Sequence, residues 1–212
     1  MKNVFRIIAI GLVGTFIFAS CNKSDDTDWN RLIEEQRIKD SIENARIKGI
    51  IANQAPQLKS YAETNFTNAK LDTATGIWYQ VITEGEASSY TYRFNSMGNG
   101  IVAPEVTVKF KEKLINGTVT DQTETDKTTT YLLSNRPYAW HTAFLPKTLS
   151  YNNQDVKIGG LTANGLKKNS QIRFISPSPW VYDTKEVKDK DGNVKIAANS
   201  PIVYEIQVID IK

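Results

Sequence analysis

Few residues of this chain could carry covalent or metal chemistry. Among its 212 residues there is one cysteine, Cys21, and one histidine, His141. A single cysteine cannot form an internal disulfide, and a single histidine cannot build a histidine metal site. Dithiol redox chemistry and cysteine-rich zinc sites are therefore excluded, and a Ser-His-Asp triad would have to use His141. A solvated or hydrogen-bonded histidine fits its Trp-His-Thr context best, so we expect no metal and no cofactor.

The charge balance gives no sign of a nucleic-acid partner. The formal net charge is +3, from 26 Lys and Arg against 23 Asp and Glu. Two of the basic residues, Lys2 and Arg6, precede an apolar stretch, and without them the net charge is only +1. Hydrophobic residues make up 40% of the chain, which is enough for a packed core. The composition therefore predicts a folded domain that does not bind nucleic acid.

The N-terminus has the pattern of a targeting signal. After Lys2 and Arg6, residues 7–19 are almost wholly apolar. About thirteen apolar residues are too few to span a bilayer comfortably but suit the core of a signal peptide. Small residues then precede Cys21, which resembles the bacterial lipobox. We expect residues 1–20 to be a lipoprotein signal peptide and Cys21 to be the lipidation site, so that a lipid anchor holds the protein at a membrane. An ordinary secretory leader is the alternative.

A short acidic segment follows the cysteine. Residues 21–30 are polar and poor in apolar side chains, as in a solvated tether. The segment also resembles the acidic export signal behind the lipidated cysteine of Bacteroidetes surface lipoproteins. That resemblance implies an outer-membrane lipoprotein on the periplasmic or cell-surface face. A plain tether is the alternative that the sequence leaves open.

Residues 31–70 are expected to form a helical extension. From 29 to 48 a loose apolar stripe recurs at helical spacing among charged residues, and Asp28 suits the N-cap. Pro56 suits the first turn of a second helix. The extension is interpreted either as a spacer that packs on the domain or as a dimerisation arm.

The hydrophobic period changes to two after Leu71, which indicates antiparallel strands with one face on a core. Strands are expected at 77–82, 90–94, 106–113, 128–133, 171–175 and 204–208. Asn116-Gly117 is a hairpin turn signal. The segment 161–168 has room for at most two helical turns. The predicted fold class is α+β, a strongly curved antiparallel sheet around one short helix, with an N-terminal helical extension.

Four segments of residues 71–212 carry a family resemblance. The stretch 75–85 reads TGIWYQVITEG, 106–117 reads VTVKFKEKLING, 174–182 reads FISPSPWVY, and 196–211 reads IAANSPIVYEIQVIDI. In this order they resemble the motifs SGLxYxVIxEG, VxVHYxGxLxDG, xxIPxxLAYG and IPPNSxLxFxVELxDI of FKBP-type peptidyl-prolyl cis-trans isomerases. The resemblance implies an FKBP-like domain over residues 71–212.

The resemblance also implies a site. In the family, apolar and aromatic side chains line a cup that takes the proline ring of the substrate. Carried over by position, the substrate-binding residues are Phe110, Tyr131, Ile158, Leu161, Ile196 and Tyr204. Tyr182 matches the tyrosine whose hydroxyl bonds the substrate carbonyl, and Asp121 matches the pocket aspartate, so these two are the implied catalytic residues. Thr120 stands where the family has a pocket phenylalanine.

The floor of the cup has two placements. The family's VIxGW segment, whose tryptophan is the floor, is poorly kept here. Aligning it with IGGL at 158–161 puts Leu161 at the floor, whereas aligning it with PYAW at 137–140 puts Trp140 there. Both placements remain open at this point.

Three functions are compatible with these residues. Prolyl isomerisation opposes amide resonance and needs no nucleophile or metal. The chain is therefore interpreted as an envelope-anchored FKBP-like isomerase or folding helper for exported proteins, of low activity. The alternatives are a catalytically silent FKBP-like module that binds a protein or glycan, and an envelope accessory protein whose aromatic residues and insertions bind a glycan or a partner protein. Trp78, Trp140 and Trp180 are expected to pack in the core, with a stacking surface for sugars as the alternative. The expected partner is a proline-containing polypeptide or a protein. Filling of the cup by residues 134–157 would favour the binding module.

Overall fold

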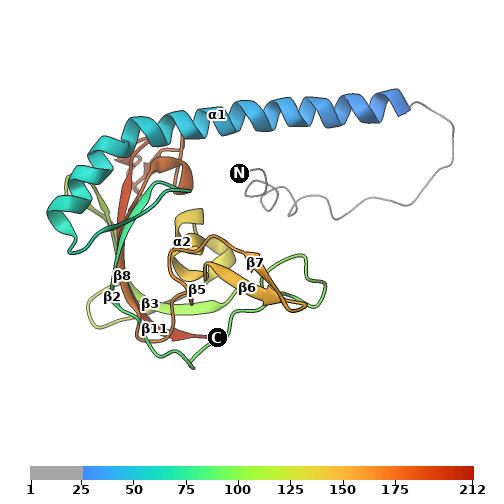
Figure 1. The fold of residues 1–212 in the computed structure, drawn as a ribbon. Helices are drawn as coiled ribbons and strands as arrows, with labels where there is room; N and C mark the ends of the chain where they lie inside the picture. The colour runs from blue at the N-terminus through green and yellow to red at the C-terminus, as the bar shows by residue number, and fades with distance from the viewer. Residues whose placement is uncertain (1–25) are drawn as a thin grey trace.

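A computed structural model describes residues 26–212 and shows an α+β architecture (Figure 1). The helices are α1 (Asp26–Asn65) and α2 (Tyr138–Phe144), with 3-10 turns η2 (Leu133–Asn135) and η3 (Ser178–Trp180). The main sheet contains β1 (Lys70–Asp72), β2 (Ile77–Thr83), β3 (Glu105–Leu114), β4 (Val119–Gln122), β5 (Thr129–Leu132), β8 (Gln171–Ser176) and β11 (Ile202–Ile211). Two small hairpins join β6 (Thr148–Tyr151) to β7 (Gln154–Lys157), and β9 (Val187–Lys188) to β10 (Val194–Ile196).

The main sheet is antiparallel, with strand order β1-β2-β8-β11-β3-β4 and β5 also paired with β3. Its central strand, β11, pairs with β3 on one side and β8 on the other. Strands β2, β3, β5, β8 and β11 are predicted correctly from the sequence, whereas β1 and β4 are not predicted. The turn at Asn116-Gly117 closes β3 onto β4 with Gly117 at a φ of 91°.

The predicted strand at 90–94 is wrong. This segment makes only an isolated bridge, between Phe94 and Ile101. Tyr90 and Tyr92 pack edge to face instead, with ring centroids 4.9 Å apart. The buried Tyr92 hydroxyl donates to the Leu166 carbonyl at 2.7 Å. Side-chain packing therefore fixes a segment whose alternation resembles a strand.

The helices also differ from expectation. One continuous helix, α1, runs through Pro56, where two helices were predicted. The missing hydrogen bond is tolerated because Leu58, Ala62 and Phe66, which follow the proline, are buried against the sheet. The short helix is α2 rather than 161–168. Gly165 adopts a φ of 70°, and the Leu166 amide donates to the Phe144 carbonyl at 2.9 Å, so this segment lies as a loop against the end of α2.

The two faces of the sheet carry different cores. On one face, Leu58 and Ala62 of α1, and Phe66 directly after it, pack with Ile175 of β8 and Val203 of β11. The larger core on the other face contains α2 and most of the buried aromatic side chains. Figure 1 shows α1 and α2 on opposite sides of the sheet. The candidate site belongs to the α2 side. The strong curvature of the sheet and the domain boundaries remain predictions.

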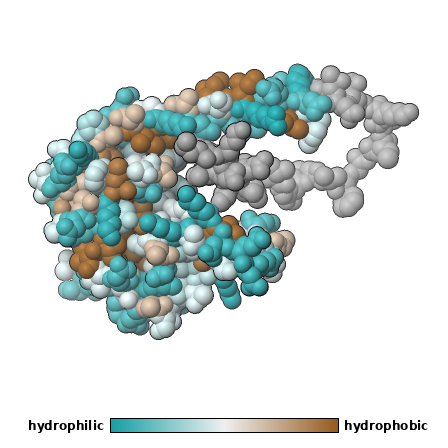
Figure 2. All heavy atoms as spheres, viewed as in Figure 1, coloured by the Kyte–Doolittle hydropathy of each residue, from teal (hydrophilic) through white to brown (hydrophobic). Residues whose placement is uncertain are grey.

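The first half of α1 projects away from the sheet (Figure 1). Large hydrophobic side chains are exposed there, and Figure 2 shows brown, hydrophobic surface along this part of the helix. They are Trp29, Leu32, Ile33, Ile38 and Ile42. Spacer and dimerisation arm both remain predictions for this half. Within the part of the chain that the structure describes, no helix is both long and apolar enough to cross a membrane.

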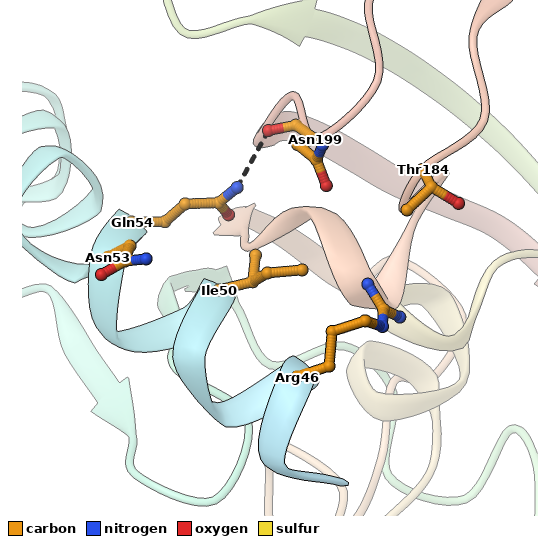
Figure 3. A pocket seen from close by; sticks show the side chains of 6 residues that line it. All are labelled: Arg46, Ile50, Asn53, Gln54, Thr184 and Asn199. Carbon is orange, nitrogen blue, oxygen red and sulfur yellow. Dashed lines mark hydrogen bonds between the residues drawn. The ribbon is translucent and has the colours of Figure 1, made fainter. Parts of the chain in front are cut away.

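The second half of α1 is fastened by polar contacts around a hollow of about 430 Å³ (Figure 3). The buried Gln54 amide donates to Ser178 Oγ and to the Asn199 carbonyl, each at 2.9 Å, and it accepts from the Ser178 amide at 2.9 Å. Arg46 reaches Asp183 with two hydrogen bonds of 2.6 and 3.0 Å. These contacts tie α1 to η3, to the loop that follows η3, and to the segment between β10 and β11.

Replacing Gln54 by alanine should loosen α1 from the domain. The change removes three hydrogen bonds, two of them buried, and leaves the Ser178 amide without its acceptor, so we expect a loss of about 2–3 kcal/mol in the free energy of unfolding. Urea denaturation measures the loss, and hydrogen exchange locates it. Gln57→Ala is the matched control because Gln57 is exposed in the same helix. Equal stability of the two variants would show that Gln54 does not fasten α1.

Candidate functional site

Trp140 lies at the centre of a group of aromatic rings. The centroid of its ring lies 5.6 Å from that of Phe110 and 5.9 Å from those of Tyr131 and Tyr204, and each pair of rings is nearly edge to face. These four residues come from α2, β3, β5 and β11, and we call them the aromatic cup. Phe144, one turn further along α2, stacks on the Trp140 ring at 5.7 Å. Four separate elements therefore bring large rings to one place on the α2 side of the sheet.

Arg136 occupies this cup. Its guanidinium carbon lies 4.3 Å from the ring centroids of both Tyr131 and Trp140, and 5.7 Å from that of Phe110. Such distances are those of cation–π contacts. Arg136 follows η2, and its amide donates to the Leu133 carbonyl at 3.0 Å, so the turn before α2 sets its position. With Arg136 in place, Trp140 has 0% of its surface exposed.

A buried carboxylate lies beside the cup. Glu112 is 1% exposed, on the same face of β3 as Phe110. Its Oε2 accepts from the hydroxyls of Tyr204 at 2.8 Å and Tyr182 at 2.9 Å. Its Oε1 accepts from Thr120 Oγ1 at 2.7 Å. Three hydroxyl donors thus satisfy one buried carboxylate, as burial of such a group requires.

Burial and charge fix the protonation of the two tyrosines. Burial raises the pKa of Tyr204 and of Tyr182, and the nearby Glu112 carboxylate raises both further, whereas Arg136 acts weakly in the opposite direction. Both hydroxyls therefore keep their protons at neutral pH. Because a carboxylate only accepts, each hydroxyl directs its one proton to Glu112.

Two N–H donors in the same place lack acceptors. Arg136 Nε and Trp140 Nε1 are both buried, and neither has a hydrogen-bond partner. Native interiors rarely leave buried donors unpaired, so each such donor needs an explanation. The cup holds Arg136 through its ring faces but gives its Nε–H nothing to bond.

His141 lies on α2 one residue after Trp140. Burial lowers its pKa, and hydrogen bonds with the backbone of Leu133 and Arg136 oppose that shift. The structure describes no group of three or more His, Cys, Asp and Glu residues within residues 26–212 that could hold a metal ion. Whether His141 stays free of any ligand remains a prediction.

The structure brings together only some of the residues that the sequence singles out. Phe110, Tyr131 and Tyr204 line the cup, and Tyr182 reaches it through Glu112. Trp140 lies among these rings, which favours the placement of PYAW at 137–140 for the floor. Leu161 is buried in the same core, and its amide donates to the Thr142 carbonyl at 2.8 Å.

The other singled-out residues do not belong to the aromatic cup, or they lie outside the described part of the chain. Ile196 is a buried residue of the same core, on β10. Ile158 is half-buried after β7, where its amide donates to the Lys147 carbonyl. Asp121 is exposed on β4, opposite Glu112 in the register. Cys21 lies outside the described residues. The roles assigned to all of these residues remain predictions.

Glu112 and Arg136 are the two residues that the sequence analysis misses. A signal for Glu112 exists, since it continues the buried positions Val106, Val108 and Phe110 at period two, where a charge is unusual. Arg136 has no comparable signal because its contacts depend on how the turn after β5 enters α2. Thr120 stands where the resembled family has a phenylalanine ring, and here its hydroxyl donates to Glu112.

The tryptophans do not form one surface for sugars. Trp140 is fully buried, and Trp180 donates its Nε1 proton to the Thr75 carbonyl at 2.7 Å. Trp78 packs in the core on the α1 side of the sheet. The three rings therefore lie in separate environments, and a joint stacking platform is absent.

Comparison with known proteins gives distant structural similarities only. No protein-family model and no curated protein matches the sequence. FkpA from Escherichia coli is 20% identical, with a TM-score of 0.49 over 90% of this chain and 75% of its own. AtFKBP13 is 15% identical, with a TM-score of 0.49 over 69% and 100%. A peptidyl-prolyl cis-trans isomerase from Pseudomonas syringae pv. tomato is 17% identical, with a TM-score of 0.46 over 75% and 96%. Similarities of this size do not assign the chain to a family.

Proposed function

We propose that residues 71–212 form an FKBP-like domain that binds proline-containing polypeptides as a folding helper, and that its prolyl isomerase activity is silent while Arg136 fills the cup. The motif resemblance supports the FKBP-like domain. The stacking of Arg136 on the fully buried Trp140 is the observation that supports a silent cup. Arg136 belongs to residues 134–157, the segment whose entry into the cup favours a binding module.

Catalysis at this cup would need room for the proline ring and a free hydrogen-bond donor. A twisted Xaa-Pro amide gains from a dry apolar site that accepts the ring and from a donor to its carbonyl. Here the guanidinium lies 4.3 Å from the two rings on which a proline ring would rest. The Tyr182 proton is already donated to Glu112. Neither requirement of the reaction is met in this conformation.

Two assays on the full chain, purified in mild detergent, test this function. A protease-free peptide isomerisation assay should give rates close to the uncatalysed background, beside a complete FKBP domain as positive control. The same preparation should slow the aggregation of an unfolded, proline-rich protein. Rates comparable to those of the positive control would show that the cup is open in solution. Failure to slow aggregation at any ratio would reject the folding helper.

We further propose that Cys21 carries the lipid anchor of an outer-membrane protein. The only cysteine in the chain follows an apolar leader of signal-peptide length. Cys21→Ser should release the protein from the membrane fraction or block its maturation, because two acyl chains supply the stable anchoring. Fractionation with and without detergent measures the change. A serine variant that still requires detergent for release would refute the anchor.

A further inference from the structure

The geometry points to Arg136 as a displaceable latch that makes the cup selective for polypeptides carrying an acidic residue next to proline. This inference rests on the proposed function of the cup and names its ligand class. It starts from three observations: the position of the guanidinium, its lack of a carboxylate partner, and the unpaired donors around it.

Arg136 is held by ring faces alone. Its guanidinium has three rings within 6 Å but no carboxylate of residues 29–212 within ion-pair distance. Glu112, the buried carboxylate beside the cup, accepts from the hydroxyls of Thr120, Tyr182 and Tyr204 and forms no ion pair with Arg136. The charge of Arg136 is therefore uncompensated by any direct pair. Cation–π contacts of this kind are modest, so the latch is held weakly enough for a ligand to displace it.

Arg173, a second arginine that lies against a ring, provides a contrast that supports this reading. Arg173 on β8 lies 5.2 Å from the Phe66 ring on the α1 side, and its Nε donates to Gln80 Oε1 at 2.8 Å. Arg173 therefore has both a ring and a hydrogen-bond acceptor. Arg136 has rings only, and its buried Nε is unpaired. Of the two, Arg136 is the one whose hydrogen bonding is incomplete without a ligand.

Displacement of the latch exposes complementary groups. When the guanidinium leaves, the Trp140 ring becomes available to a proline ring, and Trp140 Nε1 becomes available to an acceptor. The displaced guanidinium remains tethered at residue 136, beside the bound ring. A carboxylate on the residue next to the proline would pair with it in the two-pronged geometry that arginine favours. A peptide with a neutral residue next to proline must displace Arg136 without gaining an ion pair. A peptide with a basic residue there would also be repelled by the Arg136 guanidinium.

The experiment uses the full chain in detergent with three labelled peptides that differ at one residue beside proline: Glu-Pro, Gln-Pro and Lys-Pro. Fluorescence polarisation gives each Kd. We expect the wild type to bind the Glu-Pro peptide about two- to fivefold more tightly than the Gln-Pro peptide, as for an exposed ion pair, and the Lys-Pro peptide most weakly. Arg136→Ala should bind the Gln-Pro peptide roughly 3- to 30-fold more tightly than wild type, because the cup no longer has to be vacated. The charge preference should disappear in that variant.

Arg173→Ala is the matched control, since it also removes an arginine from a ring but on the other side of the sheet. It should keep the wild-type affinities and the wild-type order of peptides.

Arg136→Lys provides a second variant, which keeps the positive charge but loses the planar guanidinium group. Circular dichroism checks that each variant is folded. We expect this lysine variant to keep the preference for Glu-Pro with a weaker latch.

Acrylamide quenching of tryptophan fluorescence tests the latch without any peptide. Arg136→Ala should increase the quenched fraction because Trp140 becomes exposed, whereas Arg173→Ala should not. An unchanged quenching in Arg136→Ala, or a Glu-Pro preference that survives in it, would overturn the latch. Increased quenching with no binding of any peptide would instead reject the proline-binding function and leave the cup without this class of ligand. These two failures are therefore distinguishable.

Discussion

Trp140→Ala should lower the free energy of unfolding by about 3–5 kcal/mol, the cost of deleting a large buried aromatic side chain. The ring is fully buried, contacts four other aromatic rings, and supports the Arg136 guanidinium. Its removal leaves a cavity between α2 and the sheet that the surrounding rings, held by three strands, cannot close. Urea denaturation followed by circular dichroism measures the change.

Trp29→Ala is the control for Trp140. The same side chain is 69% exposed on the projecting half of α1. Its removal should change the stability by less than about 0.5 kcal/mol, as for a surface substitution. A loss below about 1 kcal/mol for Trp140→Ala would contradict the central position that the structure gives this residue.

Glu112→Ala should be the second most costly change, again by about 3–5 kcal/mol, because it leaves buried polar groups without their partner. The hydroxyls of Tyr182, Tyr204 and Thr120 would all lose their acceptor. Glu112→Gln keeps the shape and one accepting oxygen, so it should cost less. Thermal and urea denaturation together measure both variants.

The control for Glu112 lies on the neighbouring strand. Glu205 of β11 pairs with Lys113 at the surface, with 44% of its side chain exposed. Glu205→Ala should cost no more than about 1 kcal/mol, as exposed ion pairs do. Equal losses for the two alanine variants would mean that Glu112 does not act as the shared acceptor of the three hydroxyls.

The sequence predicts the parts of this fold that follow from local pattern. The alternation in β2, β3 and β11 is visible because one face of each strand is buried and the other carries polar side chains. The helical character of α1 is visible too, but its continuity is not, because packing of the residues after Pro56 against the sheet outweighs the cost of the proline.

The sequence predicts which aromatic rings lie at the site, but it does not predict the polar and charged residues that contact them. Phe110, Tyr131 and Tyr204 follow from motif positions, whereas the floor could not be decided, since α2 is only seven residues long and its segment has a weak helical signal. The role of Glu112 depends on hydroxyls from three distant segments, and that of Arg136 on a turn geometry. Neither role can be predicted from a local sequence pattern, because both depend on contacts between residues that are distant along the chain.

The closing of the cup by Arg136 is tested most directly by the NMR resonances of that side chain. In a full chain labelled at arginine, with the Arg136 signals assigned by their absence from the Arg136→Lys spectrum, we predict δ-methylene and Nε–H protons shifted strongly upfield. The ring currents of Tyr131 and Trp140, each 4.3 Å from the guanidinium carbon, cause that shift. Tyr131→Leu should reduce it by removing one ring. Arg136 resonances at the positions of a solvent-exposed arginine would contradict the closed cup.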